Sequence, residues 1–101
     1  MAATAGQFAV SGSVASAGTA NTHDIAGGAG MGGQPALELV ISNLHATQSL
    51  EVTVSADGTN YSAEFHIAGH GVATLRGLFA SVKVDASGNT TGYGIFASRP
   101  R

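Results

Sequence analysis

From residue 36 onward, apolar and polar side chains alternate in short runs that turn-forming residues separate. Residues 37–41, 50–55 and 61–67 each show this period of two, which is typical of β-strands with one buried face. Gly, Asn, Asp and Ser clusters recur about every 8 to 12 residues, the spacing of turns in antiparallel sandwiches and barrels. The pattern predicts an all-β fold, a small antiparallel β-sandwich or barrel that is jelly-roll-like, over residues 36–101.

The first third of the chain has a different composition. Residues 2–33 are mostly Ala, Gly, Ser and Thr, and their few large apolar side chains lie far apart. Such a stretch buries too little apolar surface to fix its own conformation. We therefore predict an extended Ala/Gly-rich N-terminal arm and hinge over residues 1–35, followed by a compact antiparallel β-domain over residues 36–101. Within the arm, Gln7–Val14 has a weak period of two and could pair as an edge or donated strand.

The predicted arm is expected to become ordered only by packing against other subunits. A domain of about 60 residues buries only about 60% of its unfolded surface and is marginally stable alone. The chain has no cysteine, so neither disulfides nor a cysteine-rich zinc site supplies the missing stability. Oligomerisation or docking onto a larger body is the remaining route. The partner-binding anchors predicted in the arm are Phe8, Val10, Val14, Ile25 and Met31.

The charge content favours life inside an assembly. Charged residues make up 10% of the 101 residues, against roughly 25% in an ordinary soluble domain, and the formal net charge is -2. A surface with so few charges has weak protection against association, although a low-charge secreted domain is an alternative interpretation. We expect no nucleic-acid partner, because no basic cluster forms, and no membrane, because no apolar run approaches the roughly 18 residues of a span. The N-terminus lacks a signal-peptide pattern, so we expect synthesis in a cytoplasm.

One glycine-rich stretch imitates a nucleotide-binding loop. Gly28–Gly33 satisfies the G-x-G-x-x-G pattern, but such a loop must follow a buried strand and open a helix. Here Pro35 and a predicted strand follow it instead. A flexible linker is therefore the preferred interpretation, and no cofactor is expected.

The histidines do not predict a metal site. His66 and His70 are four residues apart, which would place both imidazoles on one face of a helix, but this segment reads as strand and turn. His23 and His45 could complete a site, although nothing in the spacing requires it. Polar strand and loop histidines are the default interpretation.

No catalytic motif is present in the sequence. There is no G-x-S-x-G elbow and no cysteine nucleophile, and Glu38, Glu51 and Glu64 fit a solvated strand face. A Ser-His-Asp triad is geometric rather than sequential, so residue types alone do not decide that point. We expect a protein that is not an enzyme.

A glycan-binding module is an alternative that depends on two rings. Tyr61 and Tyr93 could stack on a sugar, but each falls in phase with the inward residues of its own predicted strand. Core packing is therefore favoured for both tyrosines.

The two-part layout resembles that of the small decoration, or cement, proteins on tailed-bacteriophage heads. Residues 41–98, with the segments 42–44, 55–61 and 91–98, look like the short β-proteins of phage virions. The resemblance lies in layout and carries over no functional residue. It implies a virion structural protein on the capsid exterior, made in the host cytoplasm, that binds across major capsid protein subunits and copies of itself. A tail, fibre or spike component of the virion is the alternative.

Overall fold

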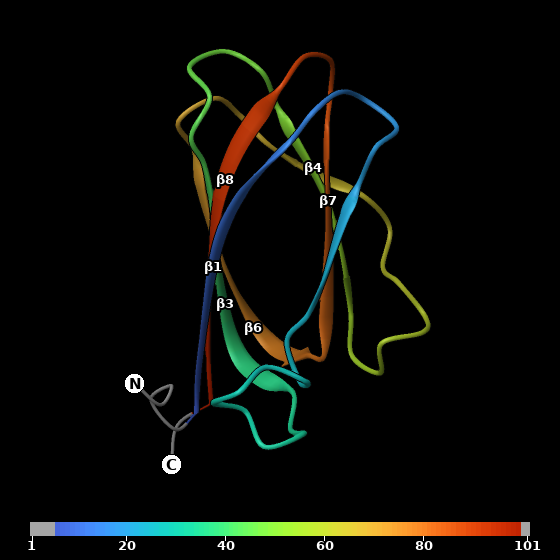
Figure 1. Ribbon diagram of the computed structural model, residues 1–101, viewed down its shortest axis with the longest axis vertical. Coiled ribbons are helices and arrows are strands. Elements are labelled where there is room, and N and C mark those ends of the chain that lie inside the picture. The colour runs from blue at the N-terminus through green and yellow to red at the C-terminus, as the bar shows by residue number, and fades with distance from the viewer. Residues whose placement is uncertain (1–5, 100–101) are drawn as a thin grey trace.

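The computed structural model describes residues 6–99, which form eight β-strands. The strands pair into two four-stranded antiparallel sheets, which lie face to face as the layers of a sandwich (Figure 1). Sheet A has the order β1-β8-β3-β6, and sheet B has the order β2-β7-β4-β5. The strands are β1 (Gln7–Val14), β2 (Asn21–Asp24), β3 (Ala36–Asn43), β4 (Leu50–Ser55), β5 (Phe65–Ile67), β6 (Val72–Phe79), β7 (Ser81–Ala86) and β8 (Thr91–Ser98).

The connectivity is that of a jelly roll. The chain crosses from one sheet to the other at every connection except the one between β4 and β5, and β8 returns to lie between β1 and β3. Eight strands arranged in this way form two interlocked Greek keys. The predicted all-β antiparallel sandwich is therefore confirmed.

One core fills the space between the sheets. In both sheets every second side chain points inward, as the two-residue period of a strand requires. These buried residues form a single apolar cluster, which contains residues from the first third of the chain as well as from the rest. Its members from the strands of sheet A are Val14, Ala36, Leu39, Ile41, Phe79, Tyr93, Ile95 and Ala97, and those of sheet B are Leu50, Val52, Ile67, Val82, Val84 and Ala86.

The separation into an arm and a domain at residue 35 is a prediction that the structure corrects. β1 pairs with β8 along its whole length, and β2 pairs with β7, so the first third supplies an edge strand to each sheet. Gly12, which interrupts the apolar pattern of β1, leaves room for the ring of Tyr93. A Cβ at Gly12 would lie 3.1 Å from the Tyr93 hydroxyl oxygen. The apparent gap in the sequence pattern is thus filled by a side chain from β8.

The predicted glycine hinge also has a different structure. Residues 26–34 form successive tight turns, closed by hydrogen bonds such as Met31 N to Gly28 O at 3.0 Å and Gln34 N to Met31 O at 3.1 Å. Met31 in these turns is buried in the core. Gly28 packs against Phe8, whose ring would overlap a Cβ at that position. The segment therefore closes one end of the sandwich.

Within residues 6–99, no helix has the length and apolar character needed to cross a membrane.

Candidate functional site

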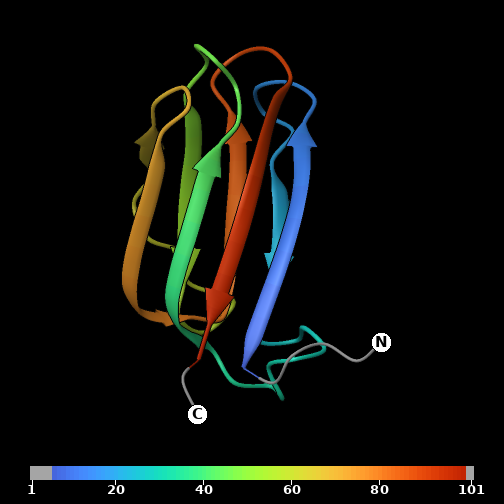
Figure 2. The same ribbon diagram turned by 90° about the vertical axis from the view of Figure 1, so that its left-hand side faces the viewer.

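The outer face of sheet A is the first candidate, because its central part carries no charged side chain. The ladder register aligns outward residues from all four strands in two successive rows. Figure 2 looks directly onto this face, with β6, β3, β8 and β1 side by side. We name this surface the neutral face. One row is Ala9, Phe96, Val40 and Thr74, the next is Ser11, Gly94, Ser42 and Val72, and Ser13 and Gly92 extend the surface beyond them.

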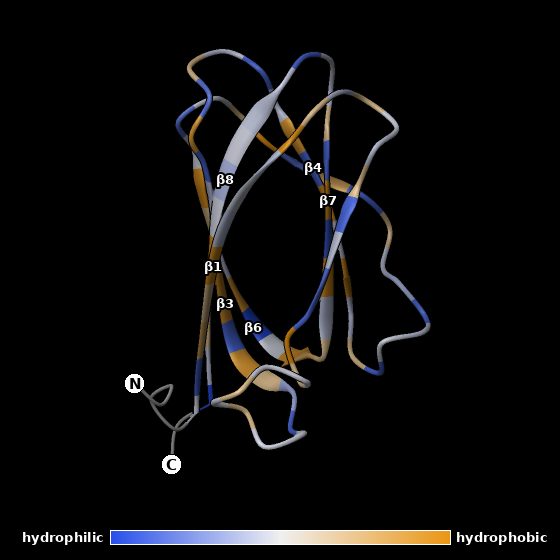
Figure 3. Cartoon of the chain, in the orientation of Figure 1, coloured by the Kyte–Doolittle hydropathy of each residue, from blue (hydrophilic) through white to orange (hydrophobic). Residues whose placement is uncertain are grey.

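Among residues 6–99, a single ion pair borders the neutral face. Glu38 and Arg76 lie opposite each other in the next row, and Arg76 Nη2 is 3.5 Å from Glu38 Oε2. In Figure 3 the upper part of β8 is pale, and blue segments lie on the lower parts of β3 and β6. Charge is thus confined to the rim at this end.

Apolar side chains stand out from the neutral face. Phe96 is 42% exposed and Val72 is 62% exposed. Leu44, which is 58% exposed, adjoins the surface beside Gly92. These three side chains lie on different strands or loops of one uncharged surface, and exposed apolar area on such a surface often marks an interaction site.

Two positions of the neutral face, Gly92 and Gly94, carry no side chain although the fold has room for one at each. A Cβ at Gly94 would meet no atom within 4 Å, and at Gly92 the nearest atoms would be 3.8 Å away. Neither glycine has a positive φ. Glycine in a strand is unfavourable by about 0.5–1 kcal/mol relative to alanine, and it often marks a place where another backbone approaches closely.

The outer face of sheet B has the opposite character. Glu51 on β4 lies opposite Asp85 on β7 and opposite His66 on β5, so three ionisable side chains share one row. Lys83 lies in the neighbouring row, opposite Thr53. We name this surface the charged face.

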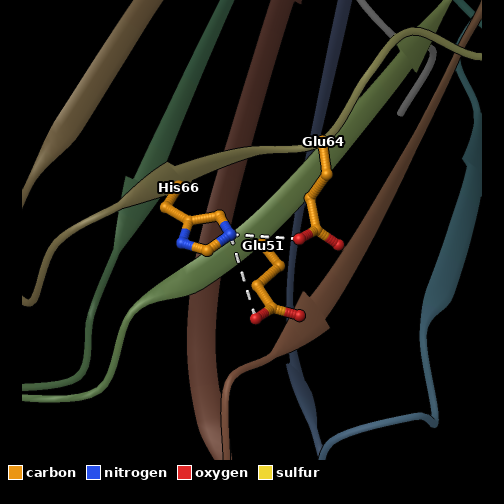
Figure 4. A group of neighbouring side chains, drawn as sticks. All are labelled: Glu51, Glu64 and His66. Atoms are coloured by element: carbon orange, nitrogen blue, oxygen red, sulfur yellow. Dashed lines mark hydrogen bonds and ion pairs between the residues drawn. The ribbon is translucent and has the colours of Figure 1, made fainter.

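A cluster of Glu51, Glu64 and His66 is the most concentrated chemistry on the charged face. His66 Nε2 lies 3.0 Å from Glu64 Oε1 and 4.0 Å from Glu51 Oε2 (Figure 4). Three possible ligand atoms, one per residue, all lie within 4.8 Å of one another. Glu51 is half-buried, whereas Glu64 and His66 are exposed. The arrangement can hold a proton or a cation between an imidazole and two carboxylates.

Tyr61 lies on the charged face and not in the core, which corrects the predicted inward orientation. Its hydroxyl is 2.7 Å from Ser81 Oγ, and the Lys83 ammonium lies 4.4 Å from the centre of its ring. The reason is that residues 61–64 leave the strand pattern after an isolated bridge between Ser55 and Tyr61. The phase of the predicted strand therefore does not apply to Tyr61.

Tyr93, in contrast, is fully buried as predicted, and it carries a polar network between the sheets. Its hydroxyl lies 2.6 Å from His23 Nε2 and accepts a hydrogen bond from Asn21 Nδ2 at 3.0 Å. Burial lowers the pKa of His23 below its ordinary value of 6.5. A neutral imidazole with its proton on Nδ1 can accept a hydrogen bond from the Tyr93 hydroxyl at Nε2.

The predicted turn at residues 57–60 is built around one carboxylate. Asp57 accepts hydrogen bonds from the backbone N–H groups of Asn60 and Thr59, and from the side chains of Asn60 and Ser55. These bonds hold the pKa of Asp57 well below its ordinary value of 3.8. The low pKa has a structural cause, because every partner belongs to the turn or to the adjoining end of β4.

The predicted arm anchors lie inside the molecule. Val14, Ile25 and Met31 are buried in the core, and Phe8 and Val10 are partly buried against it. They therefore bind the rest of the chain and are not free to anchor a partner. The surface that these side chains cover belongs to the same subunit.

The structure shows which groups His66 and His45 contact. His66 meets carboxylates and not His70, and His45 Nδ1 accepts hydrogen bonds from the Thr47 and Gln48 backbone N–H groups. The sequence predicts a solvated face for Glu51 and Glu64 and does not indicate that they lie beside His66. A Glu-x-His pair on one extended segment, facing a glutamate on the preceding strand, is the signal that would have found the cluster.

Comparisons with known proteins identify the fold and no family. No protein-family model matches the chain, and no curated protein matches its sequence. Among solved structures, the chain is similar to the Yersinia pseudotuberculosis-derived mitogen, with a TM-score of 0.52 and 12% identity over 93% of this chain and 86% of the mitogen. It is also similar to PirA, with a TM-score of 0.51 and 10% identity over 91% of this chain and 94% of PirA. At such low identity these likenesses show the β-sandwich fold alone, and a fold hosts many functions.

Proposed function

We propose that this chain is a non-enzymatic structural protein that docks through the neutral face onto a larger protein assembly. The expected setting is the exterior of a bacteriophage capsid, where the sandwich would lie across neighbouring major capsid protein subunits as a decoration protein. The observation that carries the proposal is the contrast between a flat, uncharged, partly apolar outer face and a charged opposite face on one small sandwich.

The side chains of the neutral face suit close contact with another protein surface. Ser11, Ser42 and Gly94 project little, so a partner backbone can approach the sheet closely. Phe96 and Val72 project further and supply apolar area that loses contact with water on docking. Cores of protein interfaces are depleted of charge in the same way.

The glycine at position 94 gives the sharpest test. A Gly94→Val substitution places a β-branched side chain where the fold has open space, so the free protein should fold with equal or greater stability. The same side chain should hold a partner away from the sheet. We expect co-sedimentation with heads built from the major capsid protein of the same genome to fall at least tenfold, while the melting temperature is unchanged or higher.

Thr53→Val is the matched control, because Thr53 occupies an outward position on an inner strand of the other sheet. This variant should co-sediment with heads as the unmodified chain does. Equal binding by Gly94→Val and the unmodified chain would overturn the assignment of the neutral face. Loss of binding in both variants would place the contact elsewhere or on both faces.

The alternatives have unequal support. A tail, fibre or spike component would use the same face, and electron microscopy of virions that places the protein away from the head would decide for it. Tyr93 is buried and so is not accessible for stacking on a glycan. Tyr61 remains half-buried beneath Lys83, so a glycan array that loses binding in Tyr61→Ala is the result that would favour this alternative.

A further inference from the structure

We propose that Glu51, Glu64 and His66 form a binding site for a divalent transition-metal cation, with Zn²⁺ as the occupant that the donor set favours. This site lies on the charged face, opposite the proposed docking surface, and the inference is independent of the proposed function.

The sheet fixes two of the three donors. Glu51 and His66 are direct cross-strand partners between β4 and β5, so their side chains leave the same face of the sheet side by side. Leu50, Val52 and Ile67, which flank them in sequence, are buried in the core and hold the two backbones in register. The donors are therefore positioned by the fold as well as by their own attraction.

The third donor comes from the same extended segment as His66. Glu64 precedes β5 by one residue, and its side chain returns along the segment to the imidazole (Figure 4). Figure 4 shows both carboxylates directed toward the same ring nitrogen. The arrangement offers one nitrogen and two carboxylate ligands that converge from two neighbouring segments.

The spacing of the donors fits a small cation. Zn²⁺ binds imidazole nitrogen and carboxylate oxygen at about 2.0–2.2 Å, which places tetrahedral ligands roughly 3.4 Å apart. The distances from His66 Nε2 to the two glutamate oxygens, 3.0 and 4.0 Å, lie on either side of that value. The three ligand atoms all lie within 4.8 Å of one another, so the side chains would close in on a common ion. Three protein ligands leave the fourth position to water.

The charge at the cluster also favours a cation. Within residues 6–99, neither Glu51 nor Glu64 forms an ion pair with a lysine or arginine, and His66 is their shared partner. Lys83, on the adjoining strand, lies over the Tyr61 ring. Asp85, the other cross-strand neighbour of Glu51, adds negative charge while it accepts the Gly18 backbone N–H. A divalent ion would neutralise carboxylates that the chain itself leaves in excess.

The choice of Zn²⁺ follows from the imidazole. Mg²⁺ and Ca²⁺ prefer oxygen ligands, whereas Zn²⁺ accepts nitrogen and oxygen together. Ni²⁺ and Cu²⁺ share this preference. A bound ion would tie the three-residue edge strand β5 to β4, and this strand is the shortest one in either sheet.

Isothermal titration of the full chain with ZnCl₂ tests the site. We expect one ion per chain. His66→Lys retains a cation for the carboxylates but removes the imidazole ligand, so it should weaken zinc binding at least tenfold while the metal-free variant keeps its melting temperature. Glu51→Gln, which keeps the shape of the side chain, should weaken binding similarly. Zinc should raise the melting temperature of the unmodified chain, and MgCl₂ at the same concentration should give no binding heat.

His70→Asn is the matched control, because His70 is an exposed histidine four residues away. Its φ of 59° is a conformation that asparagine tolerates. This variant should bind zinc as the unmodified chain does. Absence of binding up to millimolar zinc, full binding by both His66→Lys and Glu51→Gln, or equal loss in His70→Asn would each overturn the site.

Discussion

The two outer faces of the sandwich differ although they arise from the same alternating pattern. On sheet A the outward positions of the neutral face hold Ala, Ser, Gly, Thr, Val and Phe, and the charged pair Glu38 and Arg76 lies at its rim. On sheet B the outward positions include Glu51, Lys83 and Asp85 in the central strands. Both inner faces, in contrast, pack into one core. The fold therefore constrains the inward residues of both sheets alike, whereas the outward residues of the two sheets differ in charge.

The largest expected effect comes from removing the strands that frame both faces. Deleting residues 2–33 removes one edge strand from each sheet, together with the buried Val14, Ile25 and Met31. Each lost core side chain of this size costs about 2–5 kcal/mol when it is replaced by alanine, and the total stability of a domain is about 5–15 kcal/mol. Circular dichroism of the truncated chain should show no cooperative unfolding transition. A folded truncated domain would restore the prediction of a separate arm.

A charge on the neutral face should have the next largest effect. Val72→Lys places an ammonium on a side chain that is already 62% exposed, so the stability of the free protein should change by no more than about 0.5 kcal/mol. Docking would bury that ammonium without a partner, and binding to heads should fall at least tenfold. Co-sedimentation measures this loss.

Thr22→Lys provides the comparison, since Thr22 is an exposed outward residue at the edge of sheet B. Binding should be retained in this variant. If both lysine variants bind equally well, the difference between the faces has no functional meaning.

A smaller effect is expected from acid, through the histidine between the two sheets. Because the pKa of His23 is lowered in the folded chain, the unfolded chain takes up this proton at higher pH than the folded chain does. The free energy of unfolding should therefore decrease as the pH falls below about 6.5 and level off below the pKa of the folded state. Urea titrations between pH 7 and 5 measure this slope, and a His23→Gln variant with an undiminished slope would assign it to another group.

The smallest effect is expected at the turn that follows β4. The pKa of Asp57 is lowered in the folded chain, so its contribution is present above the ordinary value of 3.8 and is lost as the pH falls below that value. Asp57→Ala should remove this part of the acid dependence. Because the carboxylate is fully exposed to solvent, the shift in melting temperature at neutral pH should be small. A large drop at neutral pH would show that the turn is essential for folding.

The inward half of the fold could be predicted from the sequence from residue 36 onward, because alternation fixes which side chains face the core. The first third could not, since its apolar residues are sparse and their partners are distant in the chain. Val14 and Ile25 are buried in a core that they share with residues from the other end of the sequence. The role of Gly12 becomes clear from the structure, because the Tyr93 side chain fills the space beside it. Composition predicts a segment that does not fold by itself, and this prediction does not distinguish an arm from a pair of edge strands.

The candidate sites depend on register, which a single sequence does not supply. A row such as Ser11, Gly94, Ser42 and Val72 joins residues from all four strands of sheet A, and no local pattern marks it. The proposed metal-binding site similarly requires that Glu51 lie opposite His66. Only the Glu64-x-His66 half is visible in the sequence.

The most direct test of the docking face is hydroxyl-radical footprinting of the free and head-bound protein. Phe96 on the neutral face and His66 on the charged face are both exposed and reactive, so each reports on its own face in one experiment. We expect binding to heads to protect Phe96 and to leave His66 as reactive as in the free protein. Protection of His66 with Phe96 still reactive would contradict this expectation.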